Sequence, residues 1–175
     1  DEHHEITVSP SIGISLFPDH AQVPTELLKH ADTAMYQAKA AGRRTWQVYS
    51  ARMDEATRRR ATLAGLLRRV VERDELTLVY QPRYSLHHDR VVGAEALLRW
   101  RNPEFGAIPP DQFIPLAEDT GLILEIGEWV LREACTTLRA WHQAGLDGIV
   151  MSVNVSPVQL LRGDLATTLA RILAE

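Results

Sequence analysis

The chain has 175 residues, of which 45% are hydrophobic and 24% charged, the balance of a soluble globular protein. Its net charge of -4 comes from interspersed acidic and basic residues, so no basic face indicates nucleic-acid binding. The single cysteine, Cys135, excludes an intramolecular disulfide and fits a reducing compartment. We expect a cytoplasmic location, with an upstream membrane tether left open, because no apolar run reaches the roughly 18 residues of a membrane span.

The first part of the chain predicts alternating strand and helix. "EITVSPSIGISLF" is rich in β-branched residues and predicts a strand pair or a bulged strand. Apolar residues at helical spacing predict a helix from Glu26, with Thr25 as its N-cap and Gly42 at its C-cap. "TWQVYS" predicts a closing strand, and residues 51–74 predict a connecting helix.

Residues 75–175 predict a second α/β unit. "ELTLVYQPRYSL" and "VVGAEALLRW" are strands separated by the turn "HHDR", close enough to pair as a hairpin. Asp111 is a candidate cap of the helix "QFIPLAEDTG", and a longer helix is expected from about Leu124 to Ala144. "GIVMSVNVS" has the composition of a strand covered on both faces, and "LLRGDLATTLARILAE" predicts a further helix. This alternation indicates a parallel α/β layout.

Polar residues of the predicted strands fall on one face of each strand. Alternation groups them as Gln81 and Arg83 in the first strand, Glu95 and Arg99 in the second, and Ser152 and Asn154 in the third. Each strand becomes polar toward its C-terminal half, where an α/β barrel or open sheet places its site. Because the opposite faces are apolar, we expect helices to cover them, and an enclosed glutamate then needs a partner or a metal.

Structural explanations stay open for each of these residues. A glutamate on a strand can lie on a solvated edge, and Arg99 can neutralise Glu95 as a structural pair. Asn154 can simply satisfy a loop amide. Alternation alone therefore favours a functional site without deciding between these interpretations.

Five segments in their order and spacing resemble the first half of an EAL domain, the phosphodiesterase that hydrolyses cyclic diguanylate (c-di-GMP): "YQPRYSL", "GAEALLRW", "FIPLAEDTGLI", "WVLREAC" and "SVNVSPVQL". Upstream, "SPSIGISLFPDHAQVPTELLKHADTAMYQAKAAGRRTWQVYS" resembles the C-terminal part of a GGDEF domain, the diguanylate cyclase fold. The resemblance implies an α/β chain with both domains truncated. Residues 1–50 would end the GGDEF domain, residues 51–74 would connect, and residues 75–175 would begin a TIM-like (β/α)₈ barrel.

The resemblance to EAL domains also implies roles for individual residues. Glu95 and Asn154 would be metal ligands, with Glu95 catalytic through its metal, and Gln81 and Arg99 would contact the dinucleotide. Oxygen ligands of this kind suit Mg²⁺ or Mn²⁺. A divalent metal offsets the charge that builds on phosphoryl oxygens during hydrolysis. The family's other carboxylates and its lysine are expected in later strands.

In the GGDEF-like segment, Lys39 and Arg43 match positions that contact nucleotide phosphates, which implies GTP as a second ligand. Cations in a last helical turn also favour the helix dipole without any ligand. Arg44 stands where the family usually has asparagine, which weakens the case for an intact GTP site.

We therefore expect the parent protein, rather than these 175 residues alone, to hydrolyse c-di-GMP to the linear dinucleotide with Mg²⁺ or Mn²⁺. We also expect it to be a homodimer that does not bind nucleic-acid polymers. A non-catalytic c-di-GMP receptor and a diguanylate cyclase acting through the GGDEF part are the alternatives. The presence of Glu95, Arg99 and Asn154 favours catalysis, because a degenerate receptor often loses a ligand.

Overall fold

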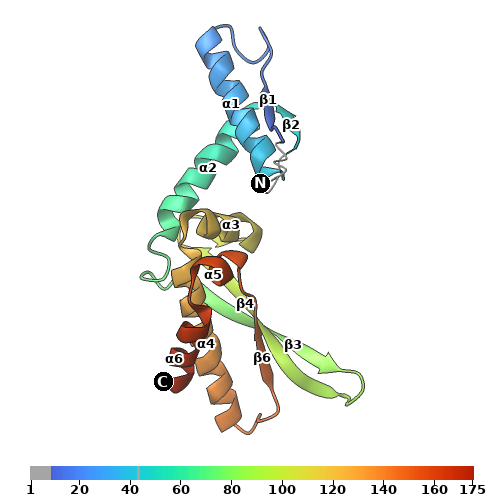
Figure 1. The fold of residues 1–175 in the computed structure, drawn as a ribbon, viewed down its shortest axis with the longest axis vertical. Helices are drawn as coiled ribbons and strands as arrows, with labels where there is room; N and C mark the ends of the chain where they lie inside the picture. Colours follow the sequence, from blue (N-terminus) through green and yellow to red (C-terminus); the bar gives the residue numbers. More distant parts are fainter. Residues whose placement is uncertain (1–8, 43) are drawn as a thin grey trace, which may run out of the picture. The chain divides into compact units, whose positions relative to one another are not determined.

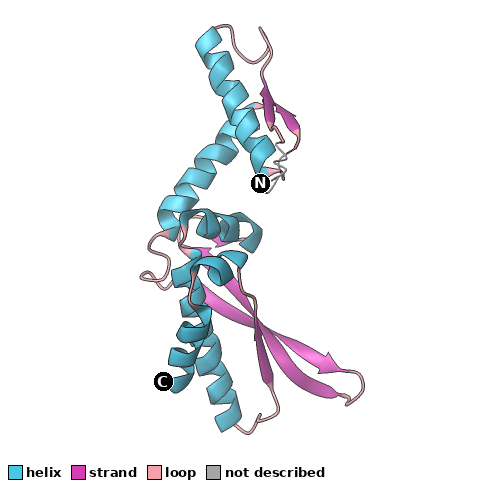
Figure 2. Ribbon diagram, viewed as in Figure 1, coloured by secondary structure: helices cyan, strands magenta, loops and turns pink. Residues whose placement is uncertain are grey.

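A computed structural model describes residues 9–42 and 44–175. The chain divides into two compact units, Asp1–Ala61 and Thr62–Glu175, and the division falls inside helix α2 (Ala51–Leu67). Both units combine helices and strands (Figure 1), as the colouring by secondary structure shows (Figure 2). Among the described residues, no helix combines the length and apolarity needed to span a bilayer.

The first unit packs a helix, α1 (Pro24–Ala40), on a parallel pair of strands, β1 (Ile12–Ile14) and β2 (Trp46–Val48). The helix approaches β1 so closely that a Cβ atom on Gly13 would lie 1.9 Å from the carbonyl oxygen of Ala31. Only glycine permits this packing, since real Cβ atoms do not come so close to backbone atoms.

The N-terminus of α1 differs from the prediction, and its C-cap lies one residue before the predicted Gly42. The N-cap is Val23 and the first helical residue is Pro24, so Thr25 is not the cap. Proline is favoured at this position because its φ is already helical and its missing N–H has no intrahelical role there. The C-cap is Ala41, and Gly42 follows with a φ of 107°, a left-handed conformation that ends the helix.

Buried Tyr49 joins the end of the small sheet to the start of α2. Its hydroxyl donates to Asp54 Oδ2 at 2.6 Å, and its ring stacks on His30 with centroids 4.0 Å apart. The hydrogen bond to Asp54 raises the pKa of the Tyr49 hydroxyl above its usual 10.0, because the carboxylate stabilises the protonated phenol.

Helix α2 ends at Leu67, whereas the sequence predicted helix through residue 74. Residues 68–74 form hydrogen-bonded turns, and Asp74 has a φ of 52° that is incompatible with continuing the helix. The apolar spacing that suggested a longer helix has another cause: Leu63, Leu67 and Val70 are all buried in the core of the second unit.

A four-stranded sheet forms the second unit's framework. Its strands are β3 (Leu76–Ser85), β4 (Arg90–Asn102), β5 (Gly106–Ile108) and β6 (Val150–Val153). β3 and β4 form the predicted antiparallel hairpin, and β6 is parallel to β4, as the α/β layout requires. β5 pairs antiparallel with the end of β4 in a segment for which the sequence predicted only a loop.

Helices α3 (Pro110–Thr120) and α4 (Ile123–Gln143) follow β5. α4 lies along one face of the sheet (Figure 1), where it contacts β3 and β6. The N-cap of α3 is Pro109, so the prediction that Asp111 caps this helix is wrong. Asp111 lies in the first turn, where its charge favours the helix dipole without a capping bond. Gly121 ends α3 with a φ of 78°.

The last predicted helix is two helices, α5 (Pro157–Arg162) and α6 (Leu165–Ala174). The break occurs because Asp164 caps α6, its carboxylate accepting from the backbone N–H of Thr167 at 3.2 Å. Such capping competes with a continuous helix, since the cap residue needs a non-helical backbone.

A carboxylate, Glu75, is buried beside the indole of Trp100 at the start of the sheet. Only 7% of Glu75 is exposed, and its Oε2 accepts from Trp100 Nε1 and from Asn102 Nδ2, both at 2.9 Å. Trp100 also packs edge-on against Phe113 of α3. Trp100 and Phe113 belong to the apolar core of the second unit. The core comprises Leu63, Leu67, Val70, Leu76, Trp100, Ile108, Phe113, Leu116, Ala117, Ile123, Ile126 and Val130.

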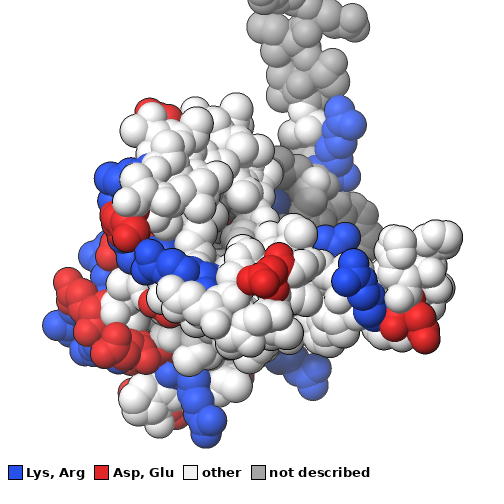
Figure 3. Space-filling view, turned by 90° about the horizontal axis from the view of Figure 1, so that it is seen from below, with Lys and Arg blue, Asp and Glu red and all other residues white. Residues whose placement is uncertain are grey.

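A charge network joins α4 to α6. Glu128 Oε1 accepts from Arg171 Nη2 at 2.8 Å and from Arg132 Nη2 at 3.3 Å, and both arginines also pair with Glu175. The hydrogen bond from Arg171 is the largest cause of the lowered pKa of Glu128, ahead of the smaller effect of Arg132. Acidic and basic side chains are also interspersed on the face shown in Figure 3, around a broad uncharged area.

Removing one arginine should move the titration of Glu128. We expect Arg171→Gln to raise the pKa of Glu128 toward its usual 4.5, which a carboxyl-carbon NMR titration would measure. The pKa of Glu128 is lower in the folded protein than its usual 4.5, so its ionised form stabilises the fold above pH 4.5. This contribution is lost as the pH falls through the pKa of Glu128 in the folded protein. Solvent screening of these half-exposed groups limits the effect to about 1 kcal/mol. An unchanged Glu128 titration would contradict the conclusion that Arg171 is the main cause of its lowered pKa.

Candidate functional site

A row of polar residues crosses three neighbouring strands of the second unit. Gln81 on β3 is paired with Glu95 on β4, and Glu95 is in turn paired with Ser152 on β6. Directly paired residues point to the same side of a sheet, so the predicted common polar face is present. The opposite face is the one that α4 covers: Tyr80 donates from β3 to the hydroxyl of Thr137 at 2.9 Å.

Glu95 and Asn154 are in direct contact. Asn154, just beyond the end of β6, donates from Nδ2 to Glu95 Oε1 at 2.7 Å. Glu95 is half-buried and Asn154 is exposed. The two residues that the resemblance paired as metal ligands are thus adjacent, although 59 positions separate them in the chain.

Oxygen donors of this pair are compatible with part of a Mg²⁺ or Mn²⁺ site. If the amide of Asn154 turned over, its oxygen would face the Glu95 carboxylate, an arrangement that a cation between the oxygens would favour. Two side chains supply fewer than the about six ligands that Mg²⁺ takes. Within residues 9–42 and 44–175, no group of three or more His, Cys, Asp and Glu side chains could hold a metal ion.

Arg99 lies further along the same face of β4 as Glu95. It is half-buried, and its Nη1 donates to the carbonyl oxygen of Leu98 at 2.9 Å. The described residues include no ion pair between Arg99 and Glu95. An along-strand separation of about 13 Å explains why, and the structure does not support the interpretation of Arg99 as a neutralising partner of Glu95.

A cavity of about 340 Å³ lies beside Arg99. Its polar lining comes from Arg99, from Asn154, Ser156 and Gln159 after β6, and from Glu118 of α3. Most of the remaining lining is apolar and includes Ala96 and Leu98 of β4 and Ile126 and Val130 of α4, whereas Glu95 does not line this cavity. Arg99 and Asn154 therefore contribute to one concave surface.

The other predicted site residues have different surroundings. Gln81 is exposed beside Glu95, and Arg83 donates from Nη1 to Ser152 Oγ at 2.7 Å on the same face. Lys39 is exposed in the last turn of α1, where the helix dipole alone accounts for a cation. Arg43 lies outside the described residues.

Sequence reasoning missed three residues next to Asn154. Ser156 caps α5 and donates from Oγ to Glu118 Oε1 at 2.6 Å, while Gln159 Oε1 accepts from the backbone N–H of Ser156 at 3.1 Å. The capping role of Ser156 and Gln159 could have been predicted from the sequence, because Ser-x-x-Gln at the start of a helix is a capping box. The contact with Glu118 had no signal in the sequence.

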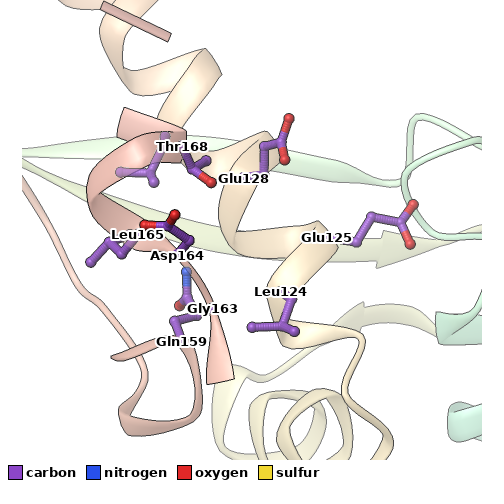
Figure 4. A pocket seen from close by; sticks show the side chains of 9 residues that line it. Leu124, Glu125, Glu128, Gln159, Gly163, Asp164, Leu165 and Thr168 are labelled. Atoms are coloured by element: carbon purple, nitrogen blue, oxygen red, sulfur yellow. The ribbon is translucent and has the colours of Figure 1, made fainter. Parts of the chain in front are cut away.

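A second cavity, of about 350 Å³, lies between α4, α5 and α6. Glu125, Glu128 and Asp164 are among the residues that line it (Figure 4). Glu128 is already paired with two arginines and Asp164 caps α6, so these two carboxylates have structural partners.

Comparison with known proteins identifies both parts of the chain. The EAL domain family matches residues 64–175, and the diguanylate cyclase GGDEF domain family matches residues 1–45. The "Bifunctional diguanylate cyclase/cyclic di-GMP phosphodiesterase MucR" of Pseudomonas aeruginosa is 42% identical over 170 residues, which are 97% of this chain and 25% of MucR. "Cyclic di-GMP phosphodiesterase PdeR" of Escherichia coli is 37% identical over 171 residues, 98% of this chain and 26% of PdeR.

A solved structure described as "PaMucR Phosphodiesterase, c-di-GMP complex" superimposes with a TM-score of 0.62 and 43% identity, covering 65% of this chain and 46% of that chain. The chain spans about a quarter of the length of the two curated relatives, at 25% and 26%. Since the EAL match alone takes in more than half of the residues, the chain belongs to the EAL domain family, with a segment of the GGDEF domain before it.

Proposed function

We propose that the protein containing this chain is a metal-dependent phosphodiesterase that hydrolyses c-di-GMP to the linear dinucleotide. The observation that carries the proposal is the contact between Glu95 and Asn154, beside Arg99 four residues further along β4 on the same alternating face. The names of MucR and PdeR, and the c-di-GMP complex of the similar solved structure, support the choice of substrate.

Glu95 and Asn154 would hold Mg²⁺ or Mn²⁺ through their side-chain oxygens. Such a metal supplies Lewis-acid polarisation of a phosphoryl oxygen and offsets developing negative charge. Arg99 has a planar fork of donors that suits a phosphate oxygen, and it would orient the scissile group. Gln81, exposed beside Glu95, would contribute amide hydrogen bonds to the dinucleotide.

The remaining proposals concern the protein as a whole. We propose residues 1–50 as the end of a GGDEF domain, residues 51–74 as a connection and residues 75–175 as EAL domain. The GGDEF match ends at residue 45, close to the first of these boundaries, whereas the EAL match begins at residue 64, inside the proposed connection. GTP binding through Lys39 and Arg43, and a homodimer, are proposed from the resemblance alone.

The proposed activity is tested by incubating the intact protein with c-di-GMP and Mg²⁺ or Mn²⁺, and by quantifying the linear dinucleotide chromatographically. We expect release that depends on the metal and stops with a chelator. Tight c-di-GMP binding without turnover would instead show a receptor. Conversion of GTP to c-di-GMP would show cyclase activity of the GGDEF part.

Removing the Arg99 side chain should weaken substrate binding. We expect Arg99→Ala to cost about 1.5–3 kcal/mol in c-di-GMP affinity, because a hydrogen bond to a charged group has this strength, or about 10- to 150-fold in Kd. Calorimetry with the intact protein measures the change. Arg90→Ala, at the exposed far end of the same strand, is the matched control and should bind normally. Equal affinity in both variants would remove Arg99 from the binding site.

A further inference from the structure

Ser156 fastens the segment that carries Asn154. Its hydroxyl accepts from the backbone N–H of Val158 at 3.1 Å and donates to Glu118 Oε1 at 2.6 Å. A serine hydroxyl has one proton to donate, and here that proton is directed to a charged acceptor, the stronger kind of hydrogen bond. The start of α5 is thereby tied to the last turns of α3.

Gln159 also holds the segment around Ser156 in place, through a hydrogen bond to its backbone. Only 7% of its surface is exposed, and its Oε1 accepts from the backbone N–H of Ser156 at 3.1 Å. Its amide lies directly over Gly127 of α4, where an added Cβ would come within 2.0 Å of Gln159 Nε2. Glycine weakens the interior of a helix relative to alanine, so its presence here is explained by the space that Gln159 occupies.

Asn154 is held between two fixed points. On one side Ser152 is in register with Glu95 across the parallel pair of strands. On the other side Ser156 is bound to both Glu118 and Gln159. With its backbone constrained at both ends, the Asn154 side chain meets Glu95 at 2.7 Å.

We propose that Glu118, Ser156 and Gln159 are positioning residues that set the orientation of Asn154 and thereby the metal affinity of its pair with Glu95. The inference rests on the proposed function, since it assigns these residues to the same metal site. None of the three needs to touch the metal. They hold Asn154 in place before the metal binds, so its side chain loses less conformational entropy on binding the metal. Residues that orient direct ligands raise metal affinity in this way.

The test is direct Mn²⁺ binding, measured by calorimetry on the intact protein. We expect Ser156→Ala and Glu118→Ala each to weaken Mn²⁺ binding by about 10-fold or more, the usual effect of removing groups that orient ligands. Ser156→Thr and Glu118→Gln keep a hydroxyl and a carbonyl acceptor, so both should restore most of the affinity. At raised Mn²⁺ concentrations, turnover by the two alanine variants should recover.

A matched control separates positioning from loss of stability. Asp164→Ala removes the N-cap of α6, the next helix, by the same kind of change as Ser156→Ala. It should lower the melting temperature and leave Mn²⁺ affinity unchanged. If Ser156→Ala gives no cooperative melt, Glu118→Ala decides, because it leaves the capping interactions of Ser156 with α5 intact.

Two results overturn the inference. Wild-type Mn²⁺ affinity in Glu118→Ala and Ser156→Ala would show that the network does not act on the metal site. An equal loss of affinity in Asp164→Ala would show a general effect of stability. Absence of Mn²⁺ binding by the wild-type protein is a different outcome, which would overturn the metal site of the proposed function together with this inference.

Discussion

Glu95→Gln is expected to lower c-di-GMP hydrolysis by the intact protein at least about 100-fold, since even residues behind direct metal ligands contribute 10- to 100-fold. The amide is nearly isosteric with the carboxylate, but it is uncharged and a weaker ligand for a hard cation. Its oxygen can still accept the hydrogen bond from Asn154. The measurement is release of the linear dinucleotide at saturating Mg²⁺.

The fold of the Glu95→Gln variant should be intact, because the half-buried side chain is not part of the apolar core and the backbone pairing with Gln81 and Ser152 does not depend on it. A thermal melt checks this point. Glu104→Gln, the same change at an exposed turn, is the control and should retain full turnover. Substantial hydrolysis by Glu95→Gln would exclude Glu95 as a metal ligand.

Removing the buried carboxylate of Glu75 should have the largest effect on stability. In Glu75→Ala, Trp100 Nε1 and Asn102 Nδ2 both lose their acceptor inside the core. A buried donor without a partner costs about 1–3 kcal/mol. Because this change removes the acceptor of two such donors, we expect a loss of about 3–5 kcal/mol. Unfolding followed by tryptophan fluorescence measures it.

Two companion variants make the Glu75 experiment decisive. Glu75→Gln keeps one acceptor oxygen and should lose less than Glu75→Ala. Glu72→Ala, at an exposed position in the preceding turns, should have stability within about 0.5 kcal/mol of wild type. If Glu75→Ala were as mild as Glu72→Ala, water would have to reach the two donors in place of the carboxylate.

Local sequence patterns determined the hairpin, the long helix and the common polar face. Strand alternation has a period of two, so placing Glu95 opposite the apolar positions required no knowledge of neighbouring strands. The apolar stripe of α4 likewise predicted its ends within one residue, from about Leu124 to Ala144 against Ile123–Gln143. Such patterns work because the face that a residue occupies depends on its own strand or helix.

Element ends were predicted less well, because several local choices compete there. Thr25 was predicted to cap α1, but the helix begins at Pro24. Asp111 was predicted to cap α3, but the N-cap is Pro109. The strand β5 exists only because the end of β4 offers it a partner. Each outcome depends on packing that a short window of sequence does not contain.

Only the tertiary structure decided which residues meet. The contact of Asn154 with Glu95 depends on the parallel pairing of β6 with β4, and the link from Ser156 to Glu118 depends on where α3 ends. The burial of Glu75 likewise follows from the position of the Trp100 indole in the core. Contacts between residues distant in sequence carry no local periodicity, so the sequence by itself determined the chemistry of the candidate site while chain packing decided its geometry.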